Sequence, residues 1–215
     1  MGMEISKIIL AFMVLINPFG ALSIFLDLTR YHSTRERRKV AQIATFSVFV
    51  VICLFTLSGN MLLKLLGISV GSFQVGGGIL VFLIAISMMS GNDNPAKPTL
   101  DTNSEELAHA RRQKPGTIAV VPLAIPMMIG PGGISSVIIY TSTARGYQDT
   151  LSILAAGLII SLICYITLMA AARISKFLGD TGLTILNRVM GMLLAAVSVE
   201  IIVSGLKALF PDLAA

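Results

Sequence analysis

Charged residues are scarce in this sequence, and that scarcity decides the class of protein. Only 13% of the 215 residues are charged and 55% are hydrophobic, whereas soluble proteins carry roughly 25% charged residues. Five charge-free runs cover residues 8–26, 40–63, 65–92, 115–144 and 150–172. A helix of about 20 residues crosses the ~30 Å hydrocarbon core of a bilayer. The composition therefore excludes a soluble domain and predicts a polytopic membrane protein.

Cysteine and histidine are also rare. Cys53 and Cys164 lie inside apolar runs, where a thiol behaves as a small apolar group, so we expect no disulfide framework. His32 and His109 fall in predicted loops, and neither H-E-x-x-H nor G-x-S-x-G occurs. We therefore expect neither an enzyme nor a cofactor. The net charge of +5 comes from residues between the apolar runs, which indicates membrane orientation and not nucleic-acid binding.

The apolar runs and their flanks predict an all-α protein with six transmembrane helices, near 5–27, 40–63, 68–90, 117–143, 150–172 and 183–206. Six spans place both termini on one side of the membrane. Loops on that side hold four basic residues, and those on the opposite side hold twelve of the total of 16. By the positive-inside rule the twelve are cytoplasmic, so we expect both termini to be external, on the periplasmic side.

A polar segment divides the chain into two related halves. We assign residues 1–91 to a first three-helix repeat, 92–116 to a cytoplasmic linker and 117–215 to a second repeat. At an offset of 113 or 114, residues 17–23 align with 130–136, Gly77 with Gly191, and 90–91 with 204–205. Because each half has three spans, the second half must be inverted relative to the first, as in many secondary transporters.

Proline and glycine interrupt the first and fourth spans near mid-membrane depth, and a solute site is expected at these interruptions. Broken helices leave polar backbone groups that lipid cannot satisfy, so such backbone must line protein or water. Free N–H groups would bind a carboxylate, and free carbonyls an ammonium group. The alternative is that the breaks only let helices kink and pack. The candidate substrate-binding residues are Asn17, Pro18, Gly20, Ser23, Gly130, Pro131, Gly132, Gly133, Ser135 and Ser136.

Three further features of the predicted spans stand outside the two breaks. Glu200 is the acidic residue well inside a span, so it is a candidate for coupling to protons or sodium. The alternatives are a structural partner for Asn187, Arg188 or a backbone donor elsewhere, or a side chain near enough to the outer surface to stay hydrated. Gly76-Gly77-Gly78 marks either a third irregular point or close helix packing, which Gly67 and Gly71 would support. The tyrosines Tyr31, Tyr140 and Tyr147 fall near span ends and are given an interfacial place without a site role.

Several motifs together resemble the MarC family over essentially the whole chain. They are Ile16-Asn17-Pro18-Phe19-Gly20, Gly67-Ile68-Ser69, Gly76-Gly77-Gly78-Ile79-Leu80, Val121 to Ser136, and Arg188-Val189-Met190-Gly191 through Glu200. The resemblance implies a multi-pass protein of the inner (plasma) membrane with six transmembrane helices. It also implies transport of small neutral amino acids, such as glycine and alanine, with ion coupling. The positions that match its two motifs are Asn17, Pro18 and Gly20, and Gly130, Pro131, Gly132 and Gly133.

The sequence analysis thus predicts a secondary transporter for small neutral amino acids in the lipid bilayer, coupled to H+ or Na+. A channel or a carrier for another small solute would use the same broken helices. A non-transporting membrane scaffold would need them only for packing. The direction of transport, the coupling ion and the formation of a homo-oligomer stay open.

Overall fold

The computed structural model describes residues 5–19, 21–90, 116, 119–144 and 146–211, and every regular element in these ranges is a helix. In chain order the elements are α1 (Ile5–Ile16), α2 (Leu22–Leu28), α3 (Thr34–Leu65), α4 (Val70–Ser90), the π-helix η1 (Ala119–Met128), α7 (Gly130–Thr143), α8 (Tyr147–Met169) and α9 (Ala171–Leu209). The predicted linker, 92–116, lies outside the described residues except for Gly116.

Four of these helices are long and apolar enough to cross a membrane: Thr34–Leu65, Val70–Ser90, Tyr147–Met169 and the Thr181–Leu209 part of α9. They correspond to four of the six expected spans. The other two expected spans each contain a break, between α1 and α2 and between η1 and α7. Large apolar side chains are exposed on the long helices, Leu57 at 74% for example, as expected of surfaces that face hydrocarbon.

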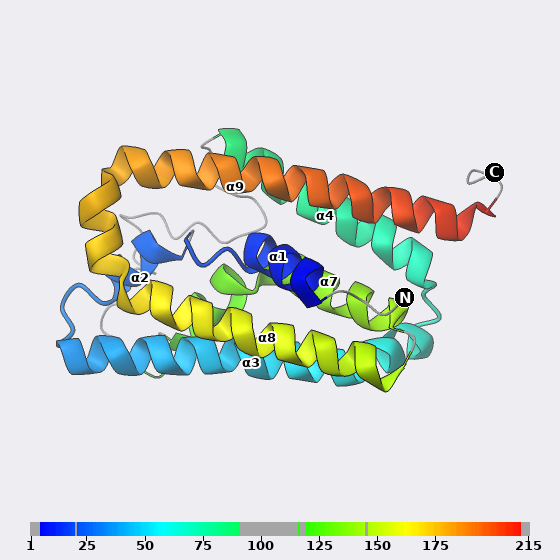
Figure 1. Cartoon of the computed structure of the whole chain (residues 1–215), viewed down its shortest axis with the longest axis horizontal. Coiled ribbons are helices and arrows are strands. Elements are labelled where there is room, and N and C mark those ends of the chain that lie inside the picture. The colour runs from blue at the N-terminus through cyan, green and yellow to red at the C-terminus, as the bar shows by residue number, and fades with distance from the viewer. Residues whose placement is uncertain (1–4, 20, 91–115, 117–118, 145, 212–215) are drawn as a thin grey trace.

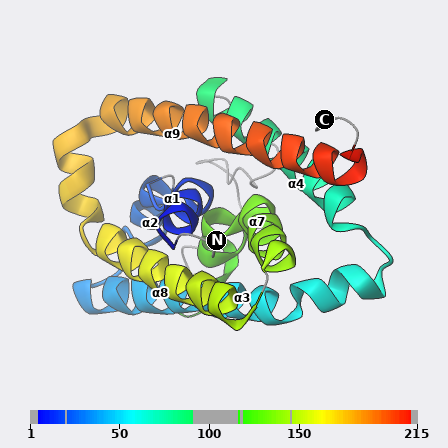
Figure 2. The same ribbon diagram turned by 45° about the vertical axis from the view of Figure 1, so that its right-hand side comes forward.

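The helices form two outer pairs with α1 and α7 between them. In both views α9 lies along α4 and α8 lies along α3, while α1 and α7 occupy the middle of the molecule (Figures 1 and 2). The middle of the fold is thus built from the elements that flank the two helix breaks.

Local sequence sets the ends of α3. Ser33 caps its start, since the Ser33 hydroxyl accepts from the Glu36 backbone N–H at 3.3 Å and the Glu36 carboxylate accepts from the Ser33 N–H at 2.8 Å. Gly67, with φ +66°, ends the helix. The N–H of Ile68 then donates to the Leu63 carbonyl at 3.0 Å, and that of Gly67 to the Lys64 carbonyl at 3.2 Å, in a Schellman motif. Gly67 is therefore a helix cap, and its predicted part in helix packing is wrong.

Glycines allow α4 and α9 to approach closely. A Cβ on Gly205 would lie 2.8 Å from the Gly71 carbonyl oxygen, and one on Gly71 would lie 3.0 Å from the Gly205 oxygen. Gly78 packs in the same way on Ile202, and Gly191 on Ala85 and Met88. α4 is continuous through Gly76-Gly77-Gly78, so these glycines do not break the helix. Gly77 and Gly78 serve close helix packing, as one of the two predictions had it, whereas Gly76 faces open space. We call Gly71, Gly78, Gly191 and Gly205 the glycine seam.

Candidate functional site

The second helix break lies between η1 and α7. Pro122 and Pro126 each remove a backbone donor within η1, where the wider i to i+5 pattern persists to Ile129, whose N–H donates to the Ala124 carbonyl at 3.1 Å. Gly130 then adopts φ +49°, and α7 starts with Gly130-Pro131-Gly132-Gly133. Ile129 precedes the helix, and its side chain makes no hydrogen bond that would cap this start. The first turn of α7 therefore presents N–H groups that its helix cannot pair.

The first helix break follows α1. Asn17 adopts φ 42° and is the non-glycine residue with positive φ in the described chain. It is 2% exposed, and its Nδ2 atom lies 3.9 Å from the sulfur of Met88 on α4. Pro18 follows it, and α2 begins at Leu22. Gly20 and the side chain of Ser23, both predicted site residues, lie outside what the structure describes.

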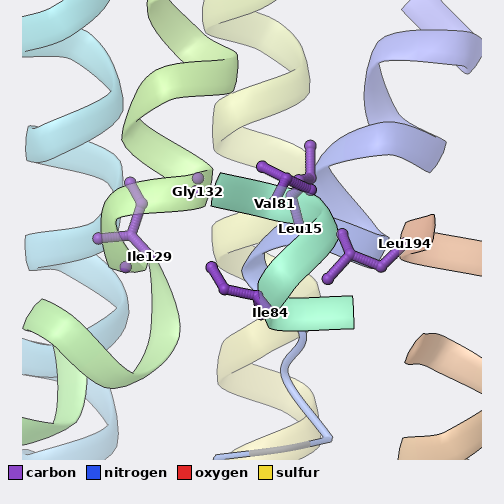
Figure 3. A pocket seen from close by; sticks show the side chains of 8 residues that line it. Leu15, Val81, Ile84, Ile129, Gly132 and Leu194 are labelled. Carbon is purple, nitrogen blue, oxygen red and sulfur yellow. The ribbon is translucent and has the colours of Figure 1, made fainter. Parts of the chain in front are cut away.

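The structure brings the two breaks together. A Cβ on Gly133 would lie 3.9 Å from Cγ1 of Ile16, the residue just before Asn17. A pocket at this junction is lined by backbone from the second motif, by Ile129 just before α7, and by apolar side chains of α1, α4 and α9: Leu15, Val81, Ile84, Ile129, Gly130, Gly132, Gly133 and Leu194 (Figure 3). Its enclosed space is close to that of one water molecule. The pocket therefore has to widen before a larger solute can enter it.

Two serines extend the site along α7. Ser135 is half-buried and packs on α4, where its Cβ would lie 3.2 Å from a Cβ on Gly77. Ser136 is 0% exposed, and its hydroxyl has no hydrogen-bond partner among the described residues. Because Ser136 follows Gly132 and Gly133 by four and three residues, it shares their helix face one turn further on. An unpaired buried hydroxyl costs free energy, and a bound polar solute or water would relieve that cost.

Glu200 does not lie in the pocket. It is exposed on α9, six residues or about 9 Å along the axis beyond Leu194. Within the described chain no hydrogen bond or ion pair joins it to Asn187 or Arg188, and Arg188 itself is exposed. The structure thus leaves the coupling prediction untested and gives no support to a structural partner within α9.

Sequence reasoning missed the apolar walls of the pocket. Leu15, Val81, Ile84 and Leu194 look like ordinary core residues in the sequence, and no motif marks them. Tyr140, predicted to lie near a span end, is half-buried, and its ring meets that of Phe12 on α1 edge to face with centroids 5.8 Å apart. Tyr31 and Tyr147 are exposed, at 76% and 81%.

Comparisons with known proteins place the chain among membrane proteins. Residues 3–210 match the model of the MarC family integral membrane proteins. The chain is 34% identical to UPF0056 membrane protein YhcE of Escherichia coli, over 96% of this chain and 94% of that protein. It is 34% identical to a UPF0056 membrane protein of Buchnera aphidicola, over 96% and 93%. A relative from Methanocaldococcus jannaschii is 33% identical over 95% and 98%.

No solved structure matches the chain. The family model covers nearly the whole sequence, and the relatives align along nearly their full lengths. This chain is therefore an integral membrane protein of the MarC family.

Proposed function

We propose that this protein is a secondary transporter for small neutral amino acids such as glycine and alanine, driven by a proton or sodium gradient across the inner membrane. One observation carries the proposal. Two buried helix breaks, each a left-handed residue followed by proline, meet beside one pocket in the middle of the fold. Irregular backbone at membrane depth is tolerated where it lines a cavity or is buried in protein, and transporters place their solute sites at such breaks.

The proposal includes six spans arranged as two inverted repeats. The positive-φ residues of the described chain support this duplication, because they fall into two pairs, Asn17 with Gly130 and Gly67 with Gly179. The first spacing, 113 (130 − 17), equals an offset that relates the two sequence halves, and the second, 112 (179 − 67), is one residue shorter. Gly67 separates α3 from α4, and Gly179 interrupts α9. The bend at Gly67 in the first half therefore has a counterpart at Gly179 in the second half.

The chemistry of the pocket suits the two ends of an amino acid. A carboxylate would accept from the unpaired N–H groups of Gly130 and Gly132, in the first turn at the positive end of the α7 dipole. The ammonium group would meet the amide oxygen of Asn17 or the carbonyls at the end of α1. The residues that line the pocket are apolar or glycine, so none of them could pair with a charged side chain on the solute. These features favour a small, neutral amino acid.

Coupling is assigned to Glu200. A carboxylate within a membrane-spanning helix is costly in hydrocarbon, and that cost falls when it binds a proton or a cation. Its distance from the pocket means that it would act through movement of α9, which also supplies Leu194 to the pocket wall. Alternating access would then arise as the α4–α9 pair moves relative to α7 and α1.

Uptake into proteoliposomes tests the class of function. Radiolabelled glycine and alanine are offered to vesicles that hold the purified protein, with an imposed proton or sodium gradient or with none, and empty vesicles give the background. The proposal predicts saturable uptake that exceeds equilibrium only when one of the gradients is present. Flux that does not saturate would indicate a channel. Background uptake by protein shown to be folded and inserted would contradict an amino-acid transporter.

A further inference from the structure

The apolar wall opposite Gly132 has a geometry that bears on which solutes fit. A Cβ on Gly132 would lie 3.2 Å from Cδ1 of Ile84 and 3.2 Å from Cγ2 of Val81, so these two α4 side chains already contact the first turn of α7. Both are almost fully buried, as is Leu194 of α9 beside them. Figure 3 shows Ile129 and Gly132 on one side of the pocket and Leu15, Val81, Ile84 and Leu194 on the other. We call Val81, Ile84 and Leu194 the size wall.

The size wall is held in place by the glycine seam. Gly78 and Ala85 bracket Val81 and Ile84 on α4. A Cβ on Gly78 would lie 3.2 Å from the Ile202 backbone nitrogen, and a Cβ on Gly191 would lie 3.1 Å from the Ala85 carbonyl oxygen. These contacts join the backbones of α4 and α9 on both sides of the wall. The wall side chains therefore cannot retreat from α7 one at a time, and space for a solute depends on their own volume.

We infer that the size wall sets the upper limit on the side chain of the transported amino acid, and this inference rests on the proposed transport function. A carboxylate on the N–H groups of Gly130 and Gly132 places the α-carbon of the solute next to these residues. A hydrogen or methyl substituent requires little room there. A branched substituent would meet Val81, Ile84 or Leu194, because the first two side chains already lie in contact with Gly132 and the third packs beside them.

Substrate selectivity of wall variants tests this inference. Uptake of glycine, alanine, valine and leucine is measured in proteoliposomes for the wild type, Ile84→Ala and Val81→Ala. Leu83→Ala is the matched control, because Leu83 is 51% exposed on the same helix and lies outside the pocket lining. We expect the wild type and the control to discriminate against valine. We expect the valine-to-alanine ratio of kcat/KM to rise on the order of 10-fold in Ile84→Ala or Val81→Ala, since one or two methylenes in an apolar pocket discriminate by roughly that factor or more.

Two smaller changes keep the inference testable if the alanine variants fold poorly. Ile84→Val removes one methylene group and should raise relative valine uptake by less than Ile84→Ala. Val81→Leu adds one methylene group and should reduce alanine uptake more than glycine uptake. Unchanged selectivity in wall variants that still transport glycine would overturn the size wall and leave the transport function standing. Absence of glycine and alanine uptake by the folded wild type would overturn both.

Discussion

Asn17 combines a left-handed backbone with a buried amide, and these two properties can be separated by mutation. Its φ of 42° is unfavourable for most L-residues by roughly 1–2 kcal/mol, whereas glycine adopts it freely. Asn17→Gly should therefore keep the thermal stability near that of the wild type, and Asn17→Ala should lower it. Both lack the amide and should lose glycine uptake. Normal uptake by Asn17→Gly would show that the residue serves only the backbone.

Glu200 gives a second prediction at the residue scale. Glu200→Gln keeps the size and polarity of the side chain but can neither bind a proton near neutral pH nor balance a cation. We expect this variant to lose gradient-driven accumulation of alanine and to retain exchange of labelled for unlabelled alanine. The two assays use the same vesicles. Full accumulation in Glu200→Gln would remove Glu200 from the coupling mechanism.

The α4–α9 pair makes a prediction at the scale of elements. A methyl group on Gly205 would meet the Gly71 carbonyl and Gln74 Cβ at 2.8 Å, so Gly205→Ala must push two backbones apart. We expect a loss of about 1–3 kcal/mol in stability, seen as a lower Tm in detergent. Gly76→Ala is the matched control, because nothing lies within 4 Å of its added Cβ and alanine favours a helix. Equal Tm values for the two variants would contradict the glycine seam.

Most elements could be predicted from the sequence, because hydrophobic run length and charge position determine where a helix crosses hydrocarbon. α3, α4 and α8 and the long part of α9 match predicted spans, and the breaks fall at Asn17-Pro18 and Gly130-Pro131, where proline and glycine predicted them. The rotation of each helix about its own axis, which decides the residues that face the interior, could not be predicted. Val81, Ile84 and Tyr140 face the interior because of tertiary packing, and apolar runs without clear amphipathic periodicity carry no signal for their inner face.

Topology is the prediction at the scale of the whole molecule. Six spans would place both termini on one side of the membrane. The bias of four basic residues against twelve predicts that this side is external. A reporter that is active only in the cytoplasm should therefore be inactive when fused after Ala215 and active when inserted in the 92–116 linker. The opposite pattern would invert the orientation.

The most direct test of the central claim, that the two helix breaks form one solute site, is saturable alanine uptake by variants at each break. Asn17→Gly and Gly132→Ala alter the two breaks, and Gly76→Ala on α4 serves as the control with space for its new methyl group. All three are compared at equal amounts of folded, inserted protein. We predict that uptake is lost in the first two variants and kept in the control. Wild-type uptake by both break variants would contradict the account.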